Sequence, residues 1–143
     1  PRRTSLLMPF VLDSSVALAW VLPDESGTAA DSLMERLLDD VAVVPSIWQL
    51  EVANVLLVAQ RRGRLTRKQA AEALSRLRDL PIEPDAAAAD STLPDVMSLA
   101  ERLDLTAYDA AYLELAKRLD APLATLDQRL RVAAGRIKVA VLP

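Results

Sequence analysis

Short apolar runs alternate with longer segments of helical spacing along most of this chain. Residues 10–12 (Phe-Val-Leu) contain no polar position, which is typical of a strand buried on both faces of a sheet. Similar short runs occupy residues 41–44, 122–126 and 137–141, and the proline-bounded stretch 81–84 allows only a short edge strand. The pattern predicts a short, mostly parallel sheet of four or five strands.

The segments between these runs repeat apolar residues every three or four positions, which indicates amphipathic helices. A first helix opens at Ser14 or Ser15, either of which can cap it, and Ser46 and Thr66 are good caps for two others. The remaining pattern predicts helices at residues 28–38, 46–62, 65–77, about 91 or 95 to 103, and 106–119, with a short one before the last strand. Alternating strands and helices favour an α/β fold of three layers, α/β/α.

The pattern fits one domain over residues 9–143, preceded by a poorly structured leader at residues 1–8. No apolar run approaches the length of a membrane span, and no stretch resembles a signal peptide. We therefore expect a cytoplasmic protein that makes no membrane contact.

Two aspartates stand directly after predicted buried strands. Asp13 follows the run at 10–12, and Asp127 follows the run at 122–126, with the hydroxyl of Thr125 two positions before it. Open parallel sheets place their ligands at the carboxyl ends of the strands. The alternative is that these residues only cap or turn the chain into the next helix.

Two further acids fall near helix starts. Glu51 lies between two apolar arcs of the helix at 46–62, so it points into a crevice where an unpaired carboxylate is costly; a salt bridge to an arginine is the alternative to a metal. Asp109 stands in the first turn of a mostly apolar helix, and the spacing from Thr106 also matches a capping box.

Composition limits the chemistry that these acids can perform. The chain has no cysteine and no histidine, which excludes thiol nucleophiles, thiolate zinc and imidazole bases. Four carboxylates in one crevice repel each other and require a hard divalent cation, and oxygen ligands suit Mg²⁺ or Mn²⁺. Such a cation activates and orients water for hydrolysis of a phosphodiester. The hydrophobic fraction of 52% also hints at an apolar association surface.

Four blocks, at residues 10–16, 45–56, 105–112 and 123–127, together resemble the successive blocks of PIN domains, and more narrowly VapC-type toxins. The resemblance implies a PIN-like fold and a Mg²⁺- or Mn²⁺-dependent ribonuclease that acts on RNA. It also implies a homodimer that is inhibited by a cognate antitoxin. By match, the acidic quartet that holds the metal is Asp13, Glu51, Asp109 and Asp127, supported by the hydroxyls of Ser14 and Thr125.

Two other functions remain open on the sequence alone. One is a PIN-fold nuclease that works in RNA processing or on DNA without an antitoxin, and the other is a catalytically silent binding module. The basic stretch that begins with Arg61, Arg62 and Arg64 is either a solvated helix end or a contact to RNA phosphates.

Overall fold

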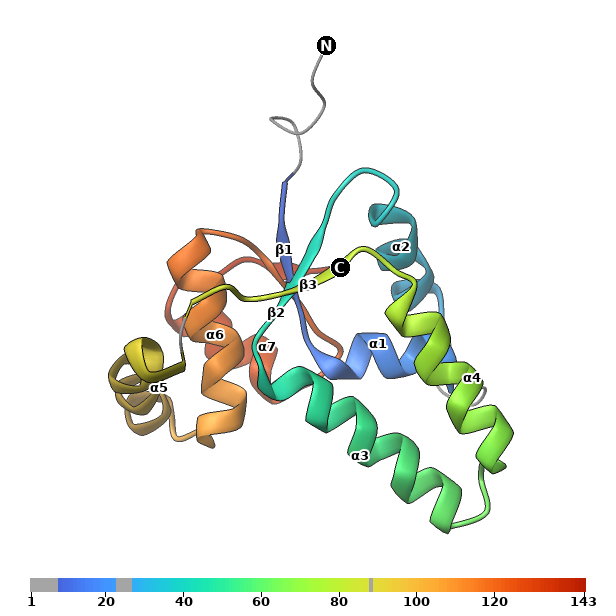
Figure 1. Ribbon diagram of the computed structural model, residues 1–143. Helices are drawn as coiled ribbons and strands as arrows, with labels where there is room; N and C mark the ends of the chain where they lie inside the picture. Colours follow the sequence, from blue (N-terminus) through green and yellow to red (C-terminus); the bar gives the residue numbers. More distant parts are fainter. Residues whose placement is uncertain (1–7, 23–26, 88) are drawn as a thin grey trace.

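The computed structural model describes residues 8–22, 27–87 and 89–143 (Figure 1). Most of the predicted leader therefore lies outside the described residues. Within them the elements are, in chain order, β1 (Phe10–Leu12), α1 (Ser14–Val21), α2 (Thr28–Arg36), β2 (Ala42–Val44), α3 (Ile47–Arg61), α4 (Arg67–Arg78), β3 (Ile82–Pro84), α5 (Ala89–Leu103), α6 (Ala107–Leu119), β4 (Leu123–Ala124), α7 (Gln128–Arg136) and β5 (Val141–Leu142).

The strands form one parallel sheet in the order β3-β2-β1-β4-β5, which confirms the predicted fold class. β1 is the central strand, and β3 is at an edge, as Pro81 before it and Pro84 at its end predict. Along the chain, β2 and then β3 are added on one side of β1, whereas β4 and then β5 are added on its other side. The strand order therefore reverses between β1 and β4. A crevice forms at such a reversal, outside the carboxyl ends of the two strands.

Helices cover the sheet on both sides, as Figure 1 shows. α1 packs against α2, α3 and α4 on one side, whereas α6 packs against β1, β4 and α5 on the other. The three residues of β1 are consequently fully buried, which explains why that strand contains no polar residue. None of the helices in the described ranges is long and apolar enough to cross a bilayer.

Several element boundaries differ from the prediction. The last strand begins at Val141 rather than at residue 137, because residues 137–139 are used to end α7: the N–H groups of Ile137 and Val139 both donate to the carbonyl of Ala134. α5 begins at Ala89, before either predicted start at residue 91 or 95, and contains Pro94.

The predicted cap of α1 is wrong. The N-cap of α1 is Asp13 itself, with extended dihedral angles, so Ser14 and Ser15 both lie inside the helix. Ser46 is the N-cap residue of α3, as predicted, but it has helical dihedral angles and its side chain makes no capping bond. Thr66 does cap α4, in a reciprocal capping box with Gln69.

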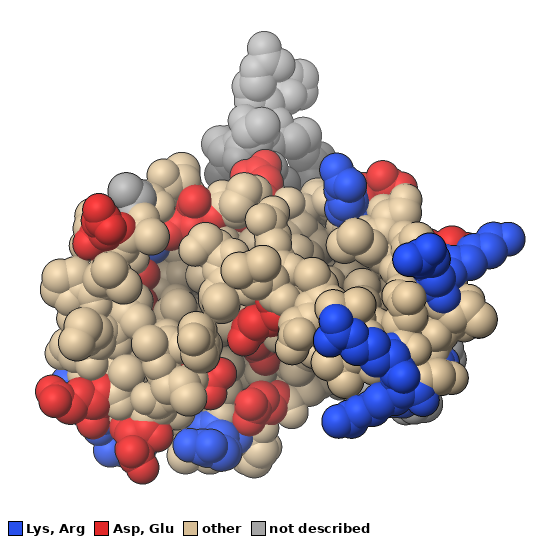
Figure 2. All heavy atoms as spheres, turned by 60° about the horizontal axis from the view of Figure 1, so that its bottom comes forward, with Lys and Arg blue, Asp and Glu red and all other residues tan. Residues whose placement is uncertain are grey.

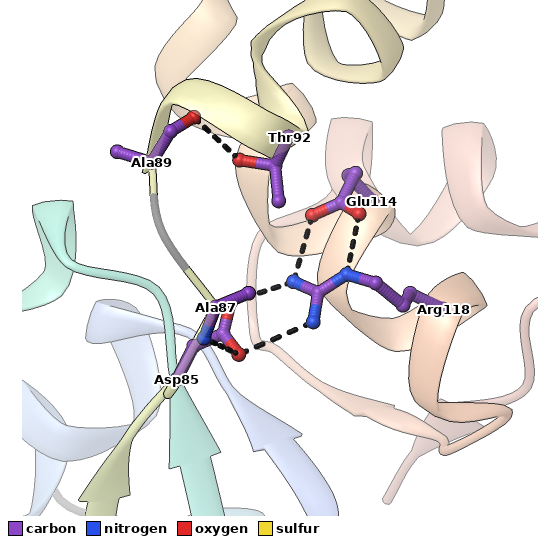
Figure 3. A network of polar contacts seen from close by, with 6 residues as sticks. All are labelled: Asp85, Ala87, Ala89, Thr92, Glu114 and Arg118. Carbon is purple, nitrogen blue, oxygen red and sulfur yellow. Dashed lines mark hydrogen bonds and ion pairs between the residues drawn. The ribbon is translucent and has the colours of Figure 1, made fainter.

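An arginine ties α6 to the segment after β3 (Figure 3). The Arg118 guanidinium donates to both carboxylate oxygens of Asp85, at 3.2 and 2.6 Å, and to both oxygens of Glu114, at 2.7 and 3.1 Å. These two carboxylates raise the pKa of Arg118, and the Arg118 hydrogen bond lowers the pKa of Asp85. This network fixes the position of α6, the helix that carries Asp109.

Truncation of Leu113 tests the packing of α6 against the sheet. Leu113 is fully buried, so Leu113→Ala should lower the free energy of unfolding by about 2–5 kcal/mol, measured by urea denaturation. Leu38 is 85% exposed, and Leu38→Ala is the matched control, which should change that free energy by less than about 0.5 kcal/mol. Equal losses in the two variants would contradict the packing described here.

Candidate active site

Asp13 lies at the carboxyl end of the central strand, where the strand order reverses. Its side chain is only 6% exposed, and a single carboxylate oxygen, Oδ2, accepts hydrogen bonds from two hydroxyl groups. The Oγ of Ser15 and the Oγ1 of Thr125 each donate to it at 2.7 Å. These bonds partly compensate for the loss of hydration that burial causes.

The same two hydroxyls also hold the loop that follows β4. The Leu126 N–H donates to Ser15 Oγ at 3.0 Å, and the Asp127 N–H donates to Thr125 Oγ1 at 3.0 Å. The end of β1, the start of α1 and the loop before α7 are thereby joined through one carboxylate. Thr125 thus donates a hydrogen bond to Asp13, and its supporting role in catalysis stays a prediction.

Glu51 projects from the second turn of α3 and is held by a tyrosine. The Tyr112 hydroxyl of α6 donates to Glu51 Oε1, so the bond joins helices on the two sides of the site. Tyr112 is fully buried; burial and the Glu51 carboxylate together raise the pKa of the Tyr112 phenol, which keeps it protonated as a donor. The predicted alternative for Glu51, a salt bridge to an arginine, does not describe the contact seen here.

Asp109 stands in the first turn of α6, as predicted. The Thr106 hydroxyl caps the helix and accepts a hydrogen bond from the Asp109 N–H at 3.1 Å. Burial raises the pKa of the Asp109 carboxyl, and the charges of Asp127 and Asp13 raise it further. Arg129 acts in the opposite direction. The Asp109 side chain therefore belongs to the same electrostatic neighbourhood as the strand-end acids.

Asp127 is exposed and is the N-cap of α7. Its Oδ1 accepts hydrogen bonds from the N–H groups of Arg129 and Leu130, at 2.9 and 3.4 Å. Asp127 therefore does cap the next helix, which was the alternative function considered for the strand-end acids. Its charge also raises the pKa values of Asp13 and Asp109, so one carboxylate both caps the helix and faces the other acids.

Three of the four acids have carboxyl pKa values above the ordinary range. Burial is the largest cause that raises the pKa of Asp13, of Glu51 and of Asp109, and neighbouring carboxylates add to it in each case. Hydrogen bonds from Thr125 and Ser15 act against this at Asp13, and bonds from Tyr112 and Ser14 do so at Glu51. Ser14 is thus placed beside the acids, as the resemblance implies.

The donors of this site fit a hard divalent cation by their chemistry, since all are carboxylate or hydroxyl oxygens. Across residues 8–22, 27–87 and 89–143, however, no three acidic side chains are already arranged to hold a metal ion. Mutual repulsion is a physical reason for carboxylates to stay apart when no cation lies between them.

Figure 2 turns this edge of the molecule towards the reader. Acidic side chains gather near the middle of the face, and basic side chains lie beside them. Arg61, Arg62 and Arg64 are exposed at the end of α3 and in the turn after it. Ten residues separate Glu51 from Arg61 along α3, which corresponds to about 15 Å of helix. Their contact with RNA stays a prediction.

Sequence reasoning missed three residues that build the site. Ser15 follows the N-cap residue Asp13 by two positions, and Tyr112 follows Asp109 by three, a spacing that places both side chains on one face of α6. Arg131 is the third: its guanidinium donates to the carbonyls of Thr125 and Leu142, both at 3.1 Å, and so ties the site loop to β5. A lone arginine on a predicted helix gave no signal for that role.

A scan against family models matches the PIN domain over residues 10–136. The chain belongs to the PIN domain family. Two relatives of this PIN domain support the assignment. Ribonuclease VapC3 of Pyrobaculum aerophilum is 31% identical over 123 residues, which cover 86% of this chain and 92% of that protein. Ribonuclease VapC9 of Mycobacterium tuberculosis is 34% identical over 125 residues, which cover 84% and 87%.

A solved structure confirms the PIN fold independently of close sequence similarity. The comparison is with the structure of VapBC2 from Rickettsia felis bound to a promoter DNA fragment. One chain of that structure superposes on the present chain with a TM-score of 0.65. The match covers 94% of the present chain and 97% of that chain at 14% sequence identity. At this identity the likeness supports the fold alone.

The raised carboxyl pKa values predict how stability depends on pH. A group whose pKa is higher in the folded state than in the unfolded state binds more protons when folded, so its ionisation destabilises the fold. Stability should therefore fall as pH rises from about 4 through the raised pKa values of Asp13, Glu51 and Asp109.

Asp13→Asn removes the cost of ionising one buried carboxyl group. It retains an oxygen that can accept hydrogen bonds from Ser15 and Thr125. In EDTA at pH 7 this variant should melt at least as high as wild type, with the difference vanishing near pH 4. The exposed Asp39→Asn is the control and should not change the melting profile. A variant that melts far lower than wild type at pH 7 would show that the charge of Asp13 is needed for folding.

Proposed function

We propose that this PIN domain is a metal-dependent endoribonuclease that acts as the toxin of a toxin–antitoxin pair. The ribonuclease activity is supported by the relatives named VapC3 and VapC9, which share more than 30% identity over most of both chains. The observation that carries the proposal is the buried carboxylate of Asp13 at the strand reversal, with three further acids around it. The four together are the proposed catalytic quartet.

The quartet would hold Mg²⁺, for which Mn²⁺ can substitute. Asp13 is the proposed central ligand, since two hydroxyls fix its Oδ2, and Glu51, Asp109 and Asp127 would complete the donor set. When bound, the cation lowers the pKa of water and neutralises charge that develops on the phosphate. A cation also removes the repulsion among the acids, so binding and stability are coupled.

The residues of this chain would supply orientation. Ser15 and Thr125 fix Asp13, and Tyr112 fixes Glu51, so two acids keep defined directions without losing their charge. Because the chain has no histidine, imidazole cannot activate the ribose 2′-hydroxyl. We expect water to be the nucleophile, which leaves a 5′-phosphate and a 3′-hydroxyl on the products.

The proposed partners are RNA, a cognate antitoxin and a second copy of the chain. The antitoxin is supported by the VapC names of the relatives and by the likeness to a VapBC2 structure. The homodimer is supported by the outer face of α3. Leu50 and Leu57 are 69% and 40% exposed there, whereas Trp48 and Val52 on the other face are buried. An apolar helix face left in water favours association.

Metal removal and replacement test the quartet. Mg²⁺ or Mn²⁺ should raise the melting temperature of wild type in EDTA-treated samples. At a metal concentration one hundred times the dissociation constant, the free energy of unfolding should rise by about 2.7 kcal/mol. Asp13→Asn should abolish both this shift and RNA cleavage, whereas the control Asp39→Asn should retain both.

The two readouts separate the alternatives. A folded Asp13→Asn protein with full cleavage would refute the assignment of the quartet. Absence of any metal-induced shift in wild type would favour a binding module whose acids serve only as caps and hydrogen-bond acceptors. A substrate panel that contains single-stranded DNA beside RNA identifies the polymer, and end-labelling identifies the product termini.

Charged substitutions on the outer face of α3 test the homodimer. Leu50→Asp and Leu57→Asp should convert a dimer into a monomer, measured by light scattering coupled to size exclusion. The control is Leu38→Asp on the segment after α2, where the side chain is 85% exposed and the dimer should persist. A wild-type chain that is monomeric at working concentration would contradict this part of the proposal.

A further inference from the structure

A groove with a volume of about 370 Å³ runs beside α7. One wall comes from the end of α5 and the turn after it, and the other comes from the exposed side of α7. Its polar lining consists of Asp104, Gln128, Arg129 and Arg136. The predicted RNA contacts at the end of α3 lie on a different helix, so this groove is a separate feature.

The two arginines are spaced along one side of α7. They are seven residues apart, which is two helical turns and about 10 Å along the axis. Both side chains are exposed. A stacked single strand rises about 3.4 Å per nucleotide, so the interval corresponds to about three nucleotides.

Arg129 connects the groove to the acidic quartet. Its backbone N–H is held by Asp127 at 2.9 Å, and its guanidinium lowers the pKa of Asp109. The guanidinium also reaches the backbone carbonyl of Asp104, at 3.5 Å. Because this carbonyl is neutral and lies at 3.5 Å, it orients the Arg129 side chain and leaves the positive charge of the guanidinium available to an anion.

The charge balance of the groove favours an anion. Arg129 and Arg136 carry two positive charges against the one negative charge of Asp104, in a protein whose net charge is −3. The quartet itself repels phosphate when no cation is bound, so a polyanionic substrate needs positive charge on the flank of the site. With 3% aromatic residues, phosphate contacts are more available to this chain than base stacking.

We propose that the groove beside α7 binds the phosphodiester backbone of the RNA substrate, with Arg129 nearest the scissile bond and Arg136 about three nucleotides away. The inference rests on the proposed ribonuclease function and adds the path that the strand takes from the quartet. Phosphate contacts carry no sequence information, so this groove sets affinity and register rather than the choice of sequence.

Binding measured without cleavage tests the path directly. Fluorescence anisotropy of a labelled, mixed-sequence single-stranded RNA is recorded in the Asp13→Asn background over a range of salt concentrations. Each of Arg129→Ala and Arg136→Ala should weaken binding about fivefold at 0.1 M salt and reduce the slope of log K against log salt by about 0.7. Lysine at either position should restore most of the slope, because it keeps the charge.

Arg78→Ala is the matched control, since it removes one exposed charge from α4, on the other side of the sheet (Figure 1). It should leave affinity, slope and wild-type cleavage unchanged. If the two groove variants behave like Arg78→Ala, the inference is wrong. Parallel losses on single-stranded DNA of the same sequence would support contact with phosphates rather than with 2′-hydroxyls.

The binding assay keeps this inference distinct from the proposed function. If wild type cleaves no RNA in the presence of Mg²⁺ or Mn²⁺, the ribonuclease proposal fails, whereas the effect of Arg129 and Arg136 on binding is still measured. If wild type cleaves RNA but neither variant changes affinity, only the path along α7 is overturned.

Discussion

The site depends on one buried carboxylate oxygen, Asp13 Oδ2, which accepts from two hydroxyls. A carboxylate removed from water at the end of a central strand is stable only where donors replace its hydration. Ser15 and Thr125 provide these donors, and each also accepts an N–H from the loop before α7. Three segments of backbone are thereby held together around one carboxylate.

This arrangement places function and stability in opposition. Burial and mutual repulsion raise the pKa values of three acids, so the fold would be more stable with those groups neutral. Packing of β1 and α6, which are fully or largely buried, offsets that cost. Clusters of carboxylates with raised pKa values are typical of functional sites, because a purely structural network would pair each acid with a cation. The network around Arg118 is an example of such pairing within the same molecule.

The sequence was sufficient to predict the sheet and the positions of the two strand-end acids, Asp13 and Asp127, for a physical reason. Fully apolar short runs are typical of buried strands, and residues directly after parallel strands share one edge of the sheet. Boundaries were less predictable where backbone hydrogen bonds decide them, as at residues 137–139, which end α7 rather than extend a strand. Ser15 and Tyr112 were missed because their roles depend on contacts across the fold. The cap of α1 was assigned to a serine because side-chain type, rather than dihedral angle, guided the prediction.

The partner that the structure gives Glu51 explains how the acidic site keeps its charge. An arginine beside Glu51 would satisfy the carboxylate, but it would also neutralise it and occupy the place of a cation. The Tyr112 hydroxyl fixes the direction of the carboxylate and contributes no charge, and the serine and threonine donors do the same for Asp13. Arginines are used elsewhere: Arg131 binds backbone carbonyls, and Arg118 binds acids outside the quartet. In the proposed function, neutral donors beside the acids and cations on the flanks would leave the negative charge of the quartet available to a metal ion, while the flanks would attract the phosphate backbone.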